Sequence, residues 1–200
     1  NTLLIYDAHE LKKEYFYISN LLSMSRFLLL AVCVYFLLAD NYLMTSIMIV
    51  VIWVSDLLDG YFARSRNEIS ELGKIIDPLA DKVTVISLVV ILLLKGIIPG
   101  WYVIFTVLRD ALILGGGLYL NYKKNTVLQS NWLGKITVFT IGGTIFFAIF
   151  ANGAKLGQFG NYMTYHSEIT ELLYTVLLFM SLVLAILSLL SYFQRFKEIK

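Results

Sequence analysis

Six long apolar runs constrain this chain more than any other feature of its sequence. Each run approaches the roughly 20 apolar residues that an α-helix needs to cross the hydrocarbon core of a bilayer. Inside lipid, backbone N–H and C=O groups must be satisfied within the protein, and a helix does this by itself. The sequence therefore predicts an all-α integral membrane protein with six transmembrane helices, at residues 20–38, 41–64, 72–95, 99–121, 132–152 and 170–193.

The residues before the first run have a different pattern. Leu11, Tyr15 and Ile18 recur at helical spacing beside charged residues. This pattern predicts an amphipathic helix lying in the membrane interface, and an ordinary connecting helix is the alternative. We expect a single domain over residues 1–200, with three parts: an interfacial segment (1–19), a six-helix bundle (20–193) and a cytoplasmic tail (194–200).

The distribution of basic residues predicts the orientation in the membrane. The net charge of +2 is too small to suggest nucleic-acid binding. With the N-terminus inside, the outer loops hold only Lys95 and Lys155, and the positive-inside rule then places both termini in the cytoplasm of an inner or plasma membrane. The cytoplasmic segments would hold Lys12, Lys13, Arg64, Arg66, Lys74, Lys123, Lys124, Arg195, Lys197 and Lys200.

Four aspartates lie at the ends of two neighbouring runs, within residues 55–82. Asp56 and Asp59 are three residues apart, and Asp77 and Asp81 are four apart, so each pair shares one helical face. An antiparallel hairpin would bring the two faces together at the cytoplasmic side. Because an ionisable group at membrane depth costs about 2.5–3.5 kcal/mol on insertion scales, these carboxylates need a compensating partner.

A divalent cation is the economical partner for these carboxylates. Like charges at this spacing repel unless a cation holds them, and hard oxygen ligands suit Mg²⁺ or Mn²⁺. Protonated aspartates, or helix caps paired with Arg64, Lys74 and Lys82, are the structural alternative. An acidic relay in an ion-coupled transporter is the alternative from another functional class.

Small and basic residues between the two pairs favour a phosphate ligand. Gly60 follows Asp59 directly and Gly73 lies four residues before Asp77, so that backbone could approach a ligand closely near each pair. Arg64 can offer a planar fork to phosphate oxygens. Carboxylates, a metal, glycine and arginine together predict a site for a diphosphate.

These residues match the signature of a known enzyme family. The stretch resembles, without a mismatch, the pattern DxxDGxxAR, eight residues, GxxxDxxxD of the CDP-alcohol phosphatidyltransferases. The matching positions are Asp56, Asp59, Gly60, Ala63, Arg64, Gly73, Asp77 and Asp81. The segment "NLLSMSR", Asn20 to Arg26, is similar to the NxxTxxR opening of the glycerol-type branch, with Ser23 in place of the threonine. The resemblance is strongest to the phosphatidylglycerophosphate synthase and cardiolipin synthase branch and covers most of the chain.

The resemblance implies a reaction, a set of residue roles and a homodimer. The family transfers the phosphatidyl group of CDP-diacylglycerol to an alcohol and releases CMP. It implies that a pair of divalent ions, Mg²⁺ or Mn²⁺, is held by Asp56, Asp59, Asp77 and Asp81, and that Asp81 takes the proton from the attacking hydroxyl. It also implies that Gly60, Ala63 and Gly73 allow the close approach of the cytidine and that Arg64 binds phosphate.

Residues outside the signature predict the acceptor alcohol. Arg109 and Lys135, with Arg26, could supply the charges that bind glycerol 3-phosphate, which is the acceptor we expect. For Arg109 and Lys135, pairing with an aspartate is the structural alternative. Phosphatidylglycerophosphate synthases carry a further arginine eight residues after the first, and that position is Gly117 here. An Arg109–Asp110 pair without the later arginine resembles cardiolipin synthases, so phosphatidylglycerol is the alternative acceptor.

Other notable residues are predicted to be structural. The run 115–117 is all glycine and predicts close helix packing, with a phosphate-cradling loop as the alternative. Residues 153–169 are expected to form an interfacial loop. The single cysteine, Cys33, excludes an intramolecular disulfide, and His9 and His166 have no partner at metal-ligand spacing.

Overall fold

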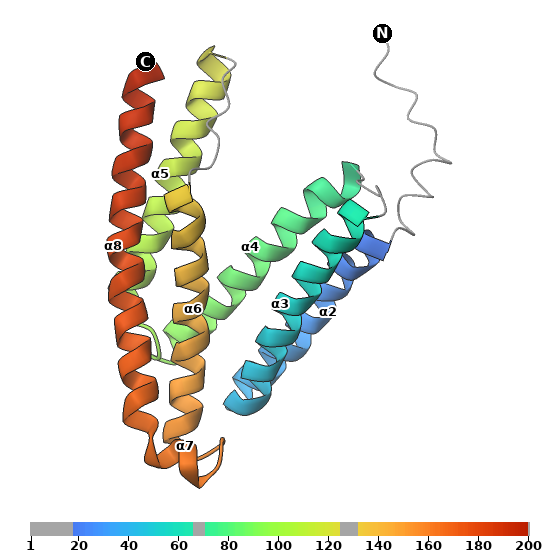
Figure 1. Ribbon diagram of the computed structural model, residues 1–200, viewed down its shortest axis with the longest axis vertical. Coiled ribbons are helices and arrows are strands. Elements are labelled where there is room, and N and C mark those ends of the chain that lie inside the picture. Colours follow the sequence, from blue (N-terminus) through green and yellow to red (C-terminus); the bar gives the residue numbers. More distant parts are fainter. Residues whose placement is uncertain (1–17, 66–70, 125–131, 200) are drawn as a thin grey trace. The chain divides into compact units, whose positions relative to one another are not determined.

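The computed structural model describes residues 18–65, 71–124 and 132–199, and every regular element in these segments is an α-helix (Figure 1). The predicted all-α class is thereby confirmed, and the helix bounds agree with the predicted runs to within a few residues at most ends. The interfacial helix expected over residues 1–19 lies almost wholly outside the described residues. The long helices are α2 (Ile18–Leu38), α3 (Tyr42–Ser65), α4 (Glu71–Leu94), α5 (Gly100–Lys124), α6 (Trp132–Lys155) and α8 (Ser167–Ile199).

Two of the described helices are long and apolar enough to cross a membrane by length and composition, Trp132–Lys155 and Ser167–Lys197. Shorter apolar helical stretches occur at Met24–Leu38, Tyr42–Leu58 and Lys82–Leu94. An 18-residue helix already rises about 27 Å, close to the ~30 Å hydrocarbon core. These helices fit a membrane protein, whereas the predicted count of six spans stays a prediction.

The segment expected as an interfacial loop over 153–169 is largely helical, so that expectation is wrong. Helix α6 runs on to Lys155, a short helix α7 covers Asn161–Tyr165, and α8 begins at Ser167. Glycines at 157 and 160 have positive φ angles of 75° and 85°, which confines the irregular backbone to a few residues. The composition of the segment, rich in glycine and aromatic residues, concealed these helical turns.

Three of the long helices end in the same backbone motif. After α4, Gly96 has a φ of 69°, the Gly96 N–H bonds to the Leu93 carbonyl, and the next N–H bonds to the Leu92 carbonyl. This pattern is a Schellman motif, in which a left-handed residue closes the last turn. Gly157 ends α6 in the same way, and Asp40, with a φ of 56°, ends α2. The chain therefore reverses direction at these points without needing side-chain caps.

The described residues divide into two compact units, with the boundary between Leu88 and Val89. In the first unit, α2 and α3 run antiparallel and pack along their length (Figure 1). Cys33 is fully buried between them, with its Sγ 3.9 Å from the Thr45 carbonyl oxygen. This burial agrees with the structural role predicted for Cys33. The prediction of a single domain remains a prediction.

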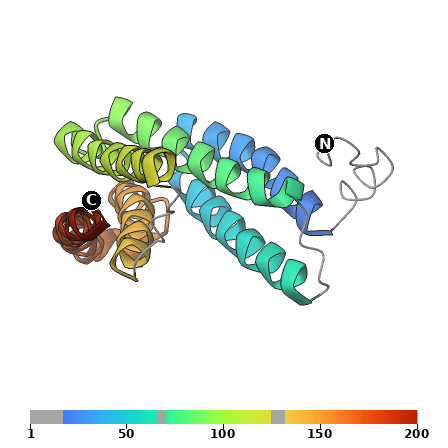
Figure 2. The same cartoon turned by 90° about the horizontal axis from the view of Figure 1, so that it is seen from above.

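In the second unit, α5, α6 and α8 alternate in direction along the chain. Thr144 of α6 contacts Ser181 of α8, and near the other end of this pair Lys155 forms an ion pair of 2.7 Å with Glu171, so these two helices are antiparallel. Figures 1 and 2 show α6 and α8 side by side. Helix α5 packs on α8 and runs parallel to it. Tyr102 contacts Ser181 and, further along both helices, Arg109 contacts Ser188, so residue numbers increase in the same direction on the two helices.

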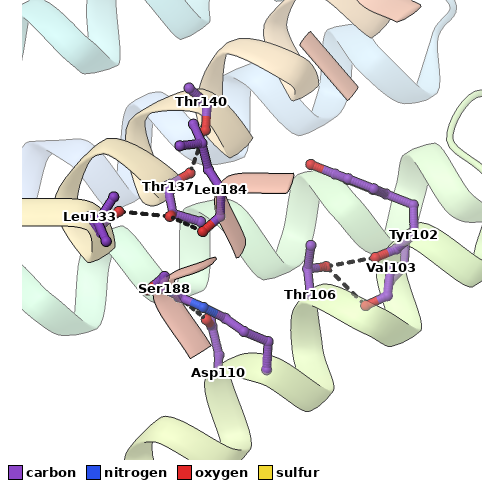
Figure 3. A network of polar contacts seen from close by, with 10 residues as sticks. Tyr102, Val103, Thr106, Asp110, Leu133, Thr137, Thr140, Leu184 and Ser188 are labelled. Carbon is purple, nitrogen blue, oxygen red and sulfur yellow. Dashed lines mark hydrogen bonds and ion pairs between the residues drawn. The ribbon is translucent and has the colours of Figure 1, made fainter. Parts of the chain in front are cut away.

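A seam of buried hydroxyl groups joins these three helices. The hydroxyls of Tyr102 and Ser181 are 2.8 Å apart, and the Thr144 hydroxyl donates to the Ser181 oxygen over 3.4 Å. Thr137 lies within hydrogen-bond distance of its own helix at Leu133 and of the Leu184 carbonyl on α8 (Figure 3). In lipid, where apolar contact alone gives little preference for one helix partner, small and polar residues of this kind hold helices together.

Ser181→Ala tests this hydroxyl seam. We expect a loss of about 1–2 kcal/mol in the free energy of unfolding, because the buried Tyr102 hydroxyl loses its partner. Thermal unfolding in detergent measures the effect. Thr175→Val on the same helix is the matched control, since the Thr175 hydroxyl is exposed and bonds within its own turn, to the Glu171 carbonyl. Equal losses in the two variants would exclude a stabilising role for the seam.

Candidate functional site

The structure places all eight signature positions on two helices. Helix α3 carries Asp56, Asp59, Gly60, Ala63 and Arg64, and helix α4 carries Gly73, Asp77 and Asp81. Because both stretches are α-helical, the positions within each aspartate pair share one helical face, as predicted. Of these eight residues, Asp56 is the one whose side chain is described. The predicted meeting of the two faces stays a prediction.

The side chain of Asp56 is held by an arginine on the neighbouring helix. Arg26 of α2 donates from Nη1 to Asp56 Oδ1 over 2.6 Å. The Arg26 side chain is 1% exposed, whereas that of Asp56 is 48% exposed. The antiparallel packing of α2 and α3 places the two residues opposite each other, and a buried guanidinium between apolar helices needs an anionic partner. The pair therefore joins the NxxTxxR-like segment to the first signature carboxylate.

The donor set on α3 and α4 suits a divalent cation. Four carboxylate positions on two helices offer hard oxygen ligands, and the half-exposed Asp56 carboxylate is accessible while one of its oxygens is fixed by Arg26. No group of three or more His, Cys, Asp or Glu side chains gathers among the described residues. Three of the four predicted ligands, Asp59, Asp77 and Asp81, lie outside the described side chains.

A second buried arginine links α5 to α8. Arg109 is 5% exposed and donates from Nη1 to Asp110 Oδ1 and from Nη2 to Ser188 Oγ, each over 2.6 Å. Its Nε is buried with no hydrogen-bond partner in the described part of the chain. The side chain of Asp110 is 62% exposed, and Ser188 is buried. The guanidinium therefore joins two helices, and its Nε–H has no acceptor among the described residues.

Lys135, the other residue predicted to contact the acceptor, is exposed on α6. It lies in the first turn of that helix, which begins at Trp132. Figure 3 shows Asp110 and Ser188 at the α5–α8 contact and Thr137, two residues after Lys135, between α6 and α8. Contact of Arg109 and Lys135 with an acceptor stays a prediction.

An apolar pocket of about 470 Å³ lies between α5 and α8, beside the glycine run 115–117. A Cβ on Gly116 would lie 3.8 Å from the Phe196 ring, whereas one on Gly115 or Gly117 would meet open space. The expected close backbone packing is therefore not what the described residues show, because bulky side chains of α8 separate the helices. The pocket is lined by Leu112, Ile113, Gly116, Gly117, Leu189, Leu190, Tyr192, Phe193 and Phe196.

Comparison with known proteins identifies the family to which this chain belongs. Residues 16–187 match the family model described as CDP-alcohol phosphatidyltransferase, which is most of the chain and includes the whole signature. The chain belongs to the CDP-alcohol phosphatidyltransferase family. This match confirms the family and the transferase class predicted from the signature.

Relatives within this family carry two different names. A CDP-diacylglycerol–glycerol-3-phosphate 3-phosphatidyltransferase of Aquifex aeolicus is 34% identical over 88% of this chain and 93% of its own length. A protein of the same name from Bacillus subtilis is 36% identical over 46% of this chain and 47% of its own. A cardiolipin synthase (CMP-forming) of Streptomyces coelicolor is 38% identical over 44% of this chain and 41% of its own. The similarity to the Aquifex protein thus extends over nearly the whole chain.

Two contacts of this CDP-alcohol phosphatidyltransferase were not expected from its sequence. The Arg26–Asp56 pair connects residues 30 apart, and the Arg109–Ser188 bond connects residues 79 apart. Ser181 and Ser188 are seven residues apart in the otherwise apolar stretch 176–190 of α8, which places them on one face. That spacing was the available signal for a polar face on α8, although it could not name the partner helix.

Proposed function

We propose that this protein is an integral-membrane phosphatidylglycerophosphate synthase, which transfers the phosphatidyl group of CDP-diacylglycerol to glycerol 3-phosphate and releases CMP. The complete eight-position signature on α3 and α4 carries the proposal, together with the family match over residues 16–187. The name of the Aquifex relative, similar over 88% of this chain, supports this acceptor. The proposed donor and acceptor are therefore those of the phosphatidylglycerophosphate synthases that the sequence resembles.

In this proposal, the aspartates of α3 and α4 bind a pair of divalent ions, Mg²⁺ or Mn²⁺. When bound, such ions would neutralise the diphosphate of the donor and make the acceptor hydroxyl more acidic. Gly60, Ala63 and Gly73 let the nucleotide approach the helix backbone, and Arg64 binds a phosphate oxygen. Support comes from the helical spacing of these positions and from the oxygen donors that they carry.

The chemical step exchanges one phosphorus–oxygen bond for another. The acceptor hydroxyl oxygen attacks the phosphatidyl phosphorus, and the bond from that phosphorus to the oxygen bridging it to CMP breaks. Asp81 takes the hydroxyl proton, and CMP leaves with the electron pair of the broken bond. Such phosphoryl transfers depend mainly on positioning and charge neutralisation, which is what the signature residues provide.

For the acceptor, we place the phosphate of glycerol 3-phosphate near Arg109 and Lys135. The Nε of Arg109 has no partner among the described residues, and because it is buried it would donate to a phosphate oxygen after a local separation of α5 and α8. Lys135 is exposed and can supply a second positive charge. Arg26, also predicted for this role, is fully buried against Asp56, which suits it to a different task that is described below.

The proposed enzyme has six spans in one domain over residues 1–200 and forms a homodimer. Its signature residues and both termini face the cytoplasm, so that the nucleotide reaches water while the acyl chains stay in the bilayer. The excess of basic residues in the segments assigned to the cytoplasm supports this orientation. Two helices that are long and apolar enough to cross a membrane support the membrane location.

One assay tests the proposal against an ion-coupled transporter. Purified protein in detergent is incubated with CDP-diacylglycerol, Mg²⁺ or Mn²⁺ and one acceptor at a time, and CMP release is measured. We expect CMP with glycerol 3-phosphate. Absence of CMP with glycerol 3-phosphate, phosphatidylglycerol, inositol 1-phosphate and serine would exclude the enzyme proposal in favour of the transporter.

The apolar pocket favours a second candidate function, that of a cardiolipin synthase. Gly117 occupies the position at which the resemblance places an arginine of phosphatidylglycerophosphate synthases, and it lines a pocket with apolar walls. Such walls suit the acyl chain of phosphatidylglycerol better than a charged phosphate. The name of the Streptomyces relative agrees with this candidate.

Gly117→Leu distinguishes the two acceptors. A side chain at 117 has room on the helix and fills the pocket, so we expect it to lower the use of phosphatidylglycerol by about tenfold or more if an acyl chain binds there. Use of glycerol 3-phosphate should stay close to that of the unmodified protein. Gly115→Leu is the matched control, because Gly115 faces open space and does not line the pocket.

The first half of this test measures CMP release by the unmodified protein with each of the two acceptors. Faster CMP release with glycerol 3-phosphate than with phosphatidylglycerol is the result we expect. The reverse order, combined with a selective loss in Gly117→Leu, would replace the first candidate function with the second.

A further inference from the structure

The contact between Arg26 and Asp56 joins two residues that the sequence placed in different roles. Arg26 was expected to contact the acceptor, and Asp56 is the first carboxylate of the signature. In the structure, the Nη1 of Arg26 is 2.6 Å from Asp56 Oδ1, a distance typical of a strong charge-assisted hydrogen bond. The carboxylate that would bind a divalent ion is therefore already fixed through one of its oxygens.

The burial of the two side chains is unequal, and this asymmetry indicates how the pair works. Arg26 is 1% exposed, so an acceptor phosphate could not reach its guanidinium without a rearrangement of α2 and α3. Asp56 is 48% exposed and remains accessible to a ligand. The arginine is thus placed behind the carboxylate, on the side of the helix interface.

A fixed guanidinium restricts the rotation of a carboxylate far more than water does. An arginine presents rigid N–H donors, and a buried one loses little further freedom when it forms the bond. Groups that hydrogen-bond to metal ligands orient them, and their removal typically weakens metal binding. The same bond also supplies the counter-charge that a buried arginine needs between apolar helices.

We infer that Arg26 is a positioning residue for the metal site: it holds Oδ1 of Asp56 so that the carboxylate is oriented for a divalent cation. This inference rests on the proposed function, because it takes Asp56 as a metal ligand. It assigns to the NxxTxxR-like segment a task in metal binding in place of acceptor recognition.

Mn²⁺ binding to the purified full-length protein in detergent tests the inference directly. The free Mn²⁺ signal in electron paramagnetic resonance gives the affinity without any turnover. We expect Arg26→Met to weaken Mn²⁺ binding by about 10–100-fold. Arg26→Lys, which keeps the charge but loses the fork, should restore part of the affinity.

A matched control uses the other buried arginine. Arg109→Met also removes a guanidinium that is paired with an aspartate and buried between helices, but its partner Asp110 lies outside the signature. We expect Arg109→Met to bind Mn²⁺ as the unmodified protein does. A general loosening of the helices would weaken Mn²⁺ binding in both variants and would contradict a specific role of Arg26.

Wild-type Mn²⁺ affinity in Arg26→Met, with a raised KM for the acceptor, would overturn the inference and return Arg26 to acceptor binding. If Arg26→Met does not fold, Arg26→Leu, which also donates no hydrogen bond to Asp56, takes its place, and an unchanged Mn²⁺ affinity in that variant would have the same meaning. If the unmodified protein binds Mn²⁺ and releases no CMP with any acceptor, the proposed function fails, whereas a weaker affinity in Arg26→Met would still support the positioning role.

Discussion

Asp81→Asn is expected to lower CMP release by at least about 10³-fold while the protein stays folded. The proposed base and one ligand of the metal pair are lost together, because an amide neither accepts a proton at neutral pH nor carries the charge of a carboxylate. CMP release from CDP-diacylglycerol at saturating Mn²⁺ and glycerol 3-phosphate measures the effect. Thermal unfolding and size-exclusion chromatography in the same detergent show whether the variant is folded.

Glu171→Gln is the matched control for the loss of one acidic group. Glu171 pairs with Lys155 between α8 and α6, both side chains are about half exposed, and neither residue belongs to the signature. We expect its CMP release to equal that of the unmodified protein. Residual activity within about tenfold of normal in Asp81→Asn would remove Asp81 from the role of base, since a positioned general base contributes about 10²–10⁴-fold.

The Arg109–Asp110 pair gives the second large effect, which is on stability and on acceptor binding together. Asp110→Ala removes the negative charge beside the buried Arg109 guanidinium, which then keeps its hydrogen bond to the neutral Ser188 hydroxyl. Because a buried charge without a counter-charge is unfavourable, we expect the free energy of unfolding to fall by about 2–3 kcal/mol. The figure is below that of a fully buried pair because Asp110 is more than half exposed. The double variant Arg109→Met/Asp110→Ala should be more stable than Asp110→Ala, since it leaves no unpaired charge.

Kinetics of the same variants separate a structural from an acceptor-binding role. If the Nε of Arg109 donates to the phosphate of glycerol 3-phosphate, Arg109→Met and the double variant should both raise the KM for that acceptor by about tenfold or more. Asp110→Ala should change this KM less. Unchanged KM values in all three variants would leave Arg109 with the structural role alone. If the double variant loses as much stability as the two single variants added together, the charge pairing of Arg109 with Asp110 is excluded.

The helices of this protein could be predicted from its sequence because two simple requirements act along the whole chain. An apolar run of membrane length has few alternatives to a helix, and turn residues mark where each run ends. The bounds of α3, Tyr42–Ser65, and α4, Glu71–Leu94, accordingly differ by one residue at each end from the predicted runs 41–64 and 72–95. The signature positions could be assigned to these helices for the same reason.

Contacts between helices could not be predicted, because hydropathy says which residues face away from water but not which helix they meet. Arg26 and Arg109 were both placed at the acceptor, whereas the structure places Arg26 against Asp56 of α3 and Arg109 against Ser188 of α8, in addition to its sequence neighbour Asp110. The glycine run was expected to bring backbones together, yet the size of Phe196 on the neighbouring helix leaves a pocket instead. In each case the missing information was the identity of the residue on the facing helix.

The parallel pairing of α5 with α8 restricts how these helices can move. Tyr102 bonds to Ser181 and Arg109 to Ser188, each pair 79 residues apart, so the two polar contacts lie seven residues apart on both helices. Sliding one helix by one or two residues would break both contacts at once, and a full heptad step would be a shift of about 10 Å. These two contacts therefore favour one register of the helices, so that a change in the width of the pocket beside Gly117 would come more easily from rotation or bending of α5 or α8 than from sliding.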